Sequence, residues 1–154
     1  MLNIKPVHNG NEVALSHYEL PIKQMIFSGH PRYIITRKKE NYYPYVIELD
    51  NEVIGVFALE VGGILTQFQF DPKGIYLRGL SISYHHQQKG YFKDIIQLIE
   101  QEIQKRFNDK ENLYLTVNVR NNAYFAFIKS GFIDEKRTIK QGISHLKVMK
   151  KHLS

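Results

Sequence analysis

The sequence predicts a mixed α/β domain. Its 154 residues, 43% of them hydrophobic, suit one globular unit with a sizeable core. Runs of β-branched and aromatic residues alternate with stretches that have helical spacing, which is typical of this class. No repeat, linker or low-complexity segment interrupts the pattern, so we expect residues 1–154 to form a single domain.

The first third of the chain predicts a strand, two helices and a hairpin. Residues 3–7 have the pattern of a short strand, and residues 12–29 carry apolar residues at helical spacing, interrupted by Pro21. We therefore expect two short helices with a break at this proline. Residues 45–49 and 53–59 flank a turn-forming sequence and predict a β-hairpin.

Turn signals divide the middle of the chain. Gly62 and Gly63 end the second hairpin strand, and residues 64–70 are expected to form either an extra strand or a loop. Residues 71–74 are a strong turn signal, after which residues 75–84 predict the next strand.

The remaining residues predict a long helix, then a strand, a short helix and two strands. The helix spans residues 90–107, and its apolar residues recur every three or four positions: Phe92, Ile95, Ile96, Ile99, Ile103 and Phe107. Residues 113–119 alternate like a strand. Asn121 and Asn122 are expected to cap a helix over 123–129 that Gly131 ends, and residues 132–139 and 144–149 predict two final strands.

Composition excludes several kinds of chemistry. The chain has no cysteine, so a disulfide, a thiolate nucleophile and a Cys-ligated zinc site are absent. The N-terminus lacks a signal-peptide run and no stretch is long and apolar enough to span a bilayer, so we expect a cytoplasmic protein with no membrane partner. The net charge of +6 favours an anionic ligand without specifying which one.

A strand followed by a polar loop and a glycine at the start of a long helix can bind phosphate. The strand is 77–83, the loop is 84–89 and the helix begins at Gly90. The first helical turn offers free N–H groups and the positive end of the helix dipole, and Lys89 adds a charge. The alternative is an ordinary strand-to-helix connection with a helix cap.

Two motifs resemble those of the GNAT acetyltransferase superfamily. Residues 87–90, with the sequence Gln-Gln-Lys-Gly, match the first four places of its coenzyme A signature, which is Gln or Arg, two residues, Gly, one residue, then Gly or Ala. Residues 121–132 resemble the second motif, a short helix that ends in Gly-Phe before a strand. The resemblance covers almost the whole chain and implies a central mixed, mostly antiparallel twisted sheet of about six or seven strands flanked by helices.

The resemblance implies acetyl-CoA as cosubstrate, no metal, and transfer to a primary amine on a small molecule, peptide or protein. The cofactor's pantetheine arm would lie between the fourth strand and the strand after the long helix, paired with exposed backbone. The backbone at Ile82 and Ser83 would face the arm and the thioester, much as in an oxyanion hole. The implied cofactor-binding residues are Ile82, Ser83, Gln87, Gln88, Lys89, Gly90, Tyr91, Phe92, Asn121, Asn122 and Phe127.

The chain departs from the family pattern at three positions. Phe92 stands where the family has Gly or Ala, and Arg120 stands where it has the helix asparagine, with Asn121 and Asn122 close by. Phe127 aligns with the tyrosine that protonates the leaving thiolate. Either Tyr124 or water is expected to supply that proton, and Tyr124 is equally explained as a residue packed on the helix face.

Glu60, at the end of the third strand, is the leading candidate for the base that deprotonates the amine. The competing interpretation is an outward-facing surface carboxylate. His85 and His86 adjoin the cofactor loop but are better explained as solvated or phosphate-facing side chains. Arg78, in mid-strand, either meets an acidic substrate or is a surface charge.

Rival functions have weaker support. Adjacent His85 and His86 do not form a zinc-binding pattern, and the three-glycine dinucleotide fingerprint is missing. The serious alternative is a non-catalytic module that binds acyl-CoA or, through its ten tyrosines, nine phenylalanines and basic charge, RNA. No aromatic-basic cluster on one strand supports nucleic acid as a partner. The final strands are available to pair two copies in a homodimer.

Overall fold

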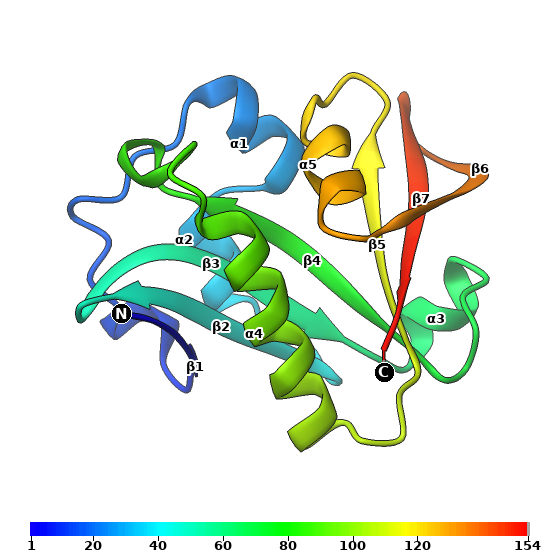
Figure 1. The fold of residues 1–154 in the computed structure, drawn as a ribbon, viewed down its shortest axis with the longest axis horizontal. Helices are drawn as coiled ribbons and strands as arrows, with labels where there is room; N and C mark the ends of the chain where they lie inside the picture. Colours follow the sequence, from blue (N-terminus) through cyan, green and yellow to red (C-terminus); the bar gives the residue numbers. More distant parts are fainter. Residues whose placement is uncertain (154) are drawn as a thin grey trace.

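One continuous sheet of seven strands forms the centre of the molecule, in the order β1-β2-β3-β4-β5-β7-β6 (Figure 1). The computed structural model describes residues 1–153. Every neighbouring pair is antiparallel except β4 and β5, which are parallel. The strands are β1 (Leu2–Pro6), β2 (Tyr42–Leu49), β3 (Glu52–Glu60), β4 (Gly74–Ile82), β5 (Asn112–Asn118), β6 (Ile133–Gln141) and β7 (Ser144–His152).

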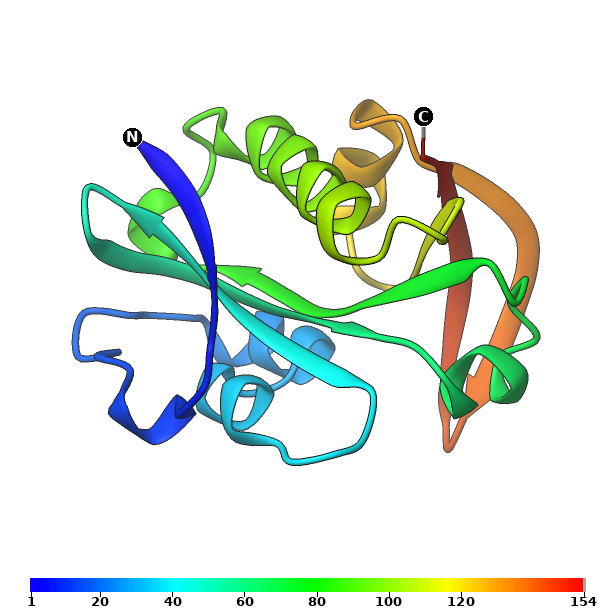
Figure 2. The ribbon, with the colours of Figure 1, turned by 90° about the horizontal axis from the view of Figure 1, so that it is seen from below.

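Helices cover both faces of this sheet. Figure 2 shows α4 and α5 on one face, and α1 and α2 on the other. The helical elements are η1 (Gly10–Glu12), α1 (Ile22–Ser28), α2 (Pro31–Thr36), α3 (Gly63–Gln67), η2 (Tyr84–His86), α4 (Tyr91–Arg106) and α5 (Ala123–Lys129). Alternate residues of β3 point to opposite faces, so Phe57 and Leu59 pack in the cluster that contains the isoleucines of α4, whereas Val56 and Ala58 pack with α2.

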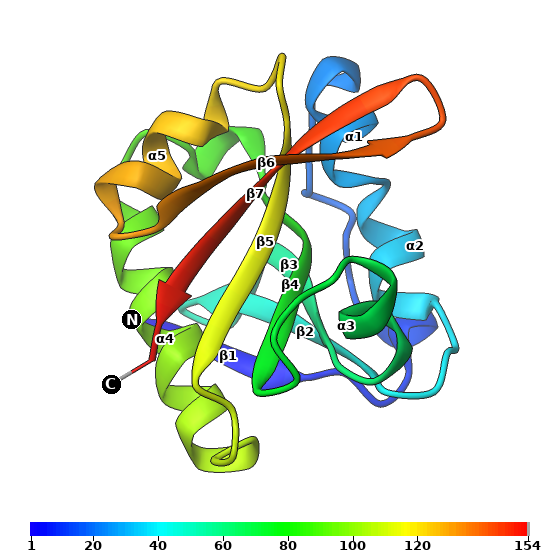
Figure 3. The same ribbon diagram turned by 90° about the vertical axis from the view of Figure 1, so that its right-hand side faces the viewer.

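Residues 63–67 form the helix α3, so the expected strand or loop is wrong for residues 64–67, whereas residues 68–70 form a loop. Ile64, Leu65 and Phe68 bury their side chains against Tyr76 and Tyr114 of the sheet. Figure 3 shows α3 in this position, beside the strands β4 and β5. The burial of one apolar helical face decided the conformation of a segment whose short apolar run is ambiguous by itself.

The N-terminal helices also differ from expectation. Residues 13–21 form no helix, and their apolar side chains Val13, Leu15 and Tyr18 pack over the α2 side of the sheet from an irregular segment. The helix expected after the break is α1, which Pro21 precedes as the N-cap. A second helix, α2, begins with Pro31 at its first turn, where the missing N–H costs nothing, and the sequence analysis did not predict it.

A β-bulge bends β4 at Gly79. The register with β3 passes from Val56 opposite Ser81 to Ala58 opposite Arg78, so β4 contains one extra residue there. Gly79 has φ +67°, and a Cβ at this position would lie 2.4 Å from the Cδ1 atom of Ile34. Only glycine therefore combines this backbone conformation with the close packing of α2.

Candidate active site

The strands β4 and β5 diverge in the middle of the sheet, and we call this region the fork. Their parallel pairing covers only three positions and ends where Tyr76 lies opposite Tyr114. Beyond that point β4 and β5 separate, as Figure 1 shows, with α5 near the open end. Where two strands separate in this way, one side of each strand has backbone groups without a partner strand. These groups can pair with an extended ligand.

Ile82 directs its backbone N–H and carbonyl into the fork. The Ser83 N–H donates to the Ile54 carbonyl of β3 at 2.7 Å, so Ser83 faces β3. In a strand, the N–H and C=O of one residue point to the same side, and those of the next residue point to the opposite side. The N–H and C=O of Ile82 therefore point away from β3. Its carbonyl accepts a hydrogen bond from Nε2 of Gln87 at 2.8 Å. Of the two residues expected to line the arm, Ile82 presents its N–H to the fork, and the amide of Ser83 is already used.

Gln87 fixes the loop between β4 and α4. In addition to the Ile82 carbonyl, its Nε2 contacts Oε1 of Gln24 in α1 at 2.7 Å, and Nε2 of Gln24 donates back to Oε1 of Gln87 at 3.3 Å. The Tyr84 N–H donates to the Glu19 carbonyl, which ties the same loop to the N-terminal segment. The side chain of Gln87 therefore holds the loop from within and leaves the backbone of the following residues facing outward.

The backbone from Gln88 to Phe92 forms a concave set of free amides. Gln88 has φ +57° and Gly90 has φ +82°, so left-handed residues alternate with ordinary ones. Within the described residues, none of the five N–H groups from Gln88 to Phe92 donates a hydrogen bond. Such a nest at the N-terminus of a 16-residue helix attracts anions through both the amides and the helix dipole. The exposed Lys89 adds a full positive charge.

Phe92 and Phe127 connect α4 to α5. Their rings meet edge to face at a centroid distance of 5.1 Å, and Phe127 also contacts Phe132 at 5.5 Å. Phe92 is half-buried against the main core, as is Tyr91. The aromatic side chain at the position where the resemblance expects Gly or Ala is thus a packing residue between the two helices on this face.

The start of α5 differs in detail from the expected cap. The Ala123 N–H donates to Oδ1 of Asn121 at 3.0 Å, whereas Asn122 is the N-cap residue and makes no side-chain capping bond. The side chain of Asn121 therefore caps the helix, and that of the exposed Asn122 is available to solvent.

Tyr124 lies on the same helix, with its hydroxyl donating to Oδ2 of Asp134 at 3.0 Å and the ammonium of Lys147 above its ring. The hydrogen bond to Asp134 raises the pKa of Tyr124 above its ordinary value of 10.0. Tyr124 therefore keeps its proton throughout the neutral range.

Glu60 is fully buried, so the interpretation as a surface carboxylate is excluded. Its Oε2 accepts from Nζ of Lys39 at 2.6 Å and its Oε1 accepts from Nε of Arg78 at 2.8 Å. Burial alone would raise the pKa of Glu60, but the bonds and charges of Lys39 and Arg78 outweigh it, and the net pKa is lowered. Glu60 is therefore ionised at neutral pH, between two cations.

Sequence reasoning missed three features around the fork. The hydroxyls of Tyr76 and Thr116 meet at 2.7 Å and join β4 to β5 just where the strands separate. The bulge at Gly79 had a signal, because an isolated glycine within a strand indicates a bulge. The reciprocal pair of Gln24 and Gln87 had none, since the residues lie 63 positions apart.

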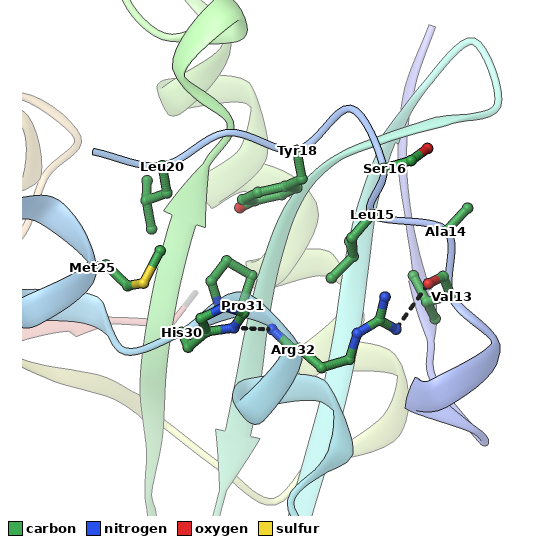
Figure 4. Close-up of a pocket in the computed structure, with 10 residues that line it drawn as sticks. All are labelled: Val13, Ala14, Leu15, Ser16, Tyr18, Leu20, Met25, His30, Pro31 and Arg32. Atoms are coloured by element: carbon green, nitrogen blue, oxygen red, sulfur yellow. Dashed lines mark hydrogen bonds between the residues drawn. The ribbon is translucent and has the colours of Figure 1, made fainter. Parts of the chain in front are cut away.

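An apolar hollow of about 600 Å³ lies on the α2 side of the sheet (Figure 4). Its wall consists of the irregular segment from Val13 to Leu20 and the residues from Met25 to Arg32. The hydroxyl of Tyr18, which lines it, donates to the Ser81 carbonyl of β4 at 2.9 Å. The hollow therefore adjoins the end of β4 on the face opposite α4.

The histidines next to the cofactor loop form no metal site. Nε2 of His85 lies 3.1 Å from Oε2 of Glu19, and both side chains are exposed. Across residues 1–153, no group of three or more His, Asp or Glu side chains is arranged to hold a metal ion. In the same part of the chain, no helix is long and apolar enough to cross a bilayer.

The structure is that of an α/β protein whose central sheet splits between β4 and β5, with free amides at the start of the long helix α4. The sequence profile of the acetyltransferase (GNAT) family matches residues 13–132. This chain belongs to the acetyltransferase (GNAT) family, which confirms the resemblance of the two motifs and the expected fold class.

Known proteins with a similar sequence or structure agree with this assignment. The chain is 29% identical over 115 residues to the uncharacterized N-acetyltransferase YbbJ of Bacillus subtilis, and the aligned region covers 72% of each chain. A spermidine N-acetyltransferase from Vibrio cholerae, solved with CoA and spermine, superposes with a TM-score of 0.72 at 17% identity over 99% of this chain and 95% of the other. The aminoglycoside acetyltransferase AAC(6')-Ib, solved with ribostamycin and coenzyme A, superposes with a TM-score of 0.78 at 13% identity. The superposition covers 99% of this chain and 93% of the other. At these identities the solved structures establish the fold.

Proposed function

We propose that this protein is an N-acetyltransferase that moves the acetyl group of acetyl-CoA to a primary amine by direct attack in a ternary complex. The observation that carries the proposal is the set of five free amides from Gln88 to Phe92, placed at the start of α4 and beside the fork. Several solved structures with this fold hold CoA or acetyl-CoA, which supports the same ligand here. The acceptor is an amine on a small molecule, a peptide or a protein.

In this proposal the cosubstrate lies along the α4 and α5 face of the fork. The pyrophosphate contacts the amides of residues 88–92 and the charge of Lys89. The pantetheine arm adds to β4 as an extended strand, with the Ile82 N–H as its partner. The side chains of Tyr91, Phe92, Phe127, Asn121 and Asn122 line the helices beside it, and Gln87 and Ser83 hold the loop and strand in place.

The reaction forms one bond and breaks one. The amine nitrogen bonds to the thioester carbonyl carbon, and the bond between that carbon and sulfur breaks as the thiolate of CoA leaves. A backbone N–H that faces the carbonyl oxygen stabilises the charge that develops there. We propose that the Tyr124 hydroxyl supplies the proton that the departing thiolate takes up, because its raised pKa means that it is protonated throughout the neutral range.

We propose that Glu60 assists the deprotonation of the attacking amine, whose proton passes to solvent water. The carboxylate lies on the α2 face of the sheet, so the amine would approach from the side opposite the cosubstrate. Because its pKa is lowered and both of its oxygens are bonded, Glu60 acts in this proposal through the two cations that it fixes, Lys39 and Arg78, and solvent takes the proton. Replacement by glutamine tests it: kcat should fall at least about tenfold with little change in the CoA dissociation constant.

Calorimetry and a thiol-release assay test the function as a whole. Acetyl-CoA should bind the purified protein and raise its melting temperature, and a panel of amines should release free thiol with matching formation of the N-acetyl product. The Tyr124→Phe variant should turn over more slowly than the wild type at neutral pH and approach it above the pKa of the thiol, near 8.5. Absence of any affinity for CoA or acetyl-CoA would remove the proposal.

A further inference from the structure

We infer that the acceptor amine also carries a carboxylate, which Arg78 binds on the α2 side of the fork. This inference rests on the proposed acetyltransferase function and names the chemical class of its acceptor. It is carried by the charge of the elements around the fork and by the unused hydrogen-bonding capacity of one arginine.

Five of the elements around the fork contain no acidic residue, whereas β3 and α4 do. Across α1, α2, β4, β5 and α5 there is not one Asp or Glu. The same five elements carry the cations Lys23, Arg32, Arg78 and Lys129. The segment that follows α2 adds three cations, Arg37, Lys38 and Lys39, and one acid, Glu40. A polycationic acceptor needs carboxylates as partners, and these elements supply none.

The carboxylate that Arg78 binds is already neutralised. Glu60 is fully buried and both of its oxygens are occupied, one by Lys39 and one by Arg78. With two cations against one carboxylate, the group keeps a net positive charge. A further ammonium would have to displace Lys39 or Arg78 from a buried partner, which costs more than a surface ion pair returns.

Arg78 has hydrogen-bonding groups to spare. Its Nε binds Glu60, whereas neither of its two terminal nitrogens has a hydrogen-bond partner among residues 1–153. The guanidinium lies 5.1 Å from the ring centroid of Tyr76, and its side chain retains 21% exposure. Glu60 and the ring of Tyr76 thus fix the guanidinium, whereas, among the residues described, its two terminal nitrogens stay free. Arg78 lies two residues beyond Tyr76, where β4 and β5 separate.

A second cation, Arg37, lies in the same region of the α2 face. The guanidinium of Arg37 lies 5.4 Å from the ring centroid of Tyr42 and 5.9 Å from that of Tyr33, and in the described part of the chain it has no ion pair. Burial raises the pKa of Tyr42 to about 12, and the charges of both Arg78 and Arg37 act against that rise. A planar guanidinium with free terminal nitrogens matches a carboxylate with two parallel hydrogen bonds.

Matched acceptors test the inference on the wild-type protein. We would measure kcat/KM by thiol release for a set of L-amino acids, for the corresponding L-amino acid amides and for spermidine. The acids should be favoured over their amides by about tenfold or more, mainly through KM, because each amide lacks the charge that Arg78 binds. Spermidine should be a poor acceptor.

Variants locate the effect. In Arg78→Gln the preference for acids over amides should fall to near one, and in Arg78→Lys it should be reduced, because lysine keeps the charge and loses the paired hydrogen bonds. Lys105→Gln removes one positive charge from the exposed side of α4 and should leave the preference unchanged. The ratio of two acceptors on one variant is independent of any general loss of folded protein.

The results separate this inference from the proposed function. Equal kcat/KM for acids and amides, or a preference for spermidine, would overturn the inference and leave the acetyltransferase assignment intact. If no amine in the set is acetylated, titration of N-acetyl amino acids and their amides into the CoA complex decides: equal affinity overturns the inference, and tighter binding of the acids supports it. A protein that does not bind CoA would overturn both.

Discussion

Replacing Gly90 with alanine tests whether the amides at the start of α4 hold the diphosphate. Gly90 has φ +82° and ψ 7°, a left-handed conformation that L-residues adopt at a cost. A Cβ built at this position meets no atom within 4 Å, so the protein itself has room for a methyl group. That open space is where the proposed phosphate lies, above the amides of the nest.

Two effects of Gly90→Ala can therefore be calculated separately. The left-handed conformation should cost about 1–2 kcal/mol of unfolding free energy. For a chain of this size, each 1 kcal/mol lowers the melting temperature by about 2–4 °C. The methyl group and any local rotation that relieves the strain both disturb the amide nest, so we expect the CoA dissociation constant to rise at least about tenfold, which corresponds to about 1.4 kcal/mol.

Gly142→Ala is the matched control. Gly142 also has a positive φ, +59°, and open space around its Cβ position, but it lies in the turn between β6 and β7. Both variants should lose similar stability in thermal denaturation without ligand. Only Gly90→Ala should lose affinity for CoA in calorimetry, and the loss should be as large with ADP as with CoA because both carry the diphosphate.

Equal CoA affinity of Gly90→Ala and Gly142→Ala would contradict the role of the α4 amides in binding the diphosphate. That result would mean that the diphosphate does not depend on the amides of this loop. A parallel loss of CoA affinity in both variants would show instead that general destabilisation, and not the nest, controls binding.

Further predictions concern the sheet and the aromatic contact. Glu60→Gln should lower the unfolding free energy by about 3 kcal/mol at neutral pH, because it leaves two cations without their buried partner. Since the folded-state pKa of Glu60 is lowered, this difference from wild type is fully present above the ordinary value of 4.5 and should shrink as pH falls below it, which urea unfolding at several pH values would show. Gly79→Ala should destabilise by more than Gly142→Ala, because its methyl group meets the side chain of Ile34 in addition to the backbone strain; equal losses would argue against the tight packing of α2 on the bulge. Phe92→Ala should lower stability by about 2 kcal/mol through the lost contact with Phe127, measured by thermal denaturation, and an increase in stability would contradict the role of this ring in joining α4 to α5.

The sequence indicated the fold class and most elements because their signals are local. The apolar spacing of α4 sets its bounds within a residue or two, and the turn residues between β2 and β3 mark their hairpin. The segments that were predicted wrongly are those whose conformation depends on distant partners. Residues 63–67 form a helix because the rings of Tyr76 and Tyr114, far along the chain, offer it an apolar surface.

The candidate site divides in the same way. The glycine and the polar loop before α4 are consecutive in the sequence, so their capacity to bind phosphate could be predicted from local residues. The ion pairs of Glu60 with Lys39 and Arg78 could not be predicted in this way, because three separate segments bring these side chains together. The sequence left this carboxylate as either a base or a surface charge, and only its burial excluded the second.

By itself, then, the sequence determined the family and predicted the position of the cofactor loop, because motif residues that act through their own backbone are contiguous. The tertiary structure decided which peptide groups are free, which charges are already paired, and where the two central strands separate. These properties depend on the hydrogen-bond partners and burial of each group, and such partners come from segments that meet only when the sheet forms.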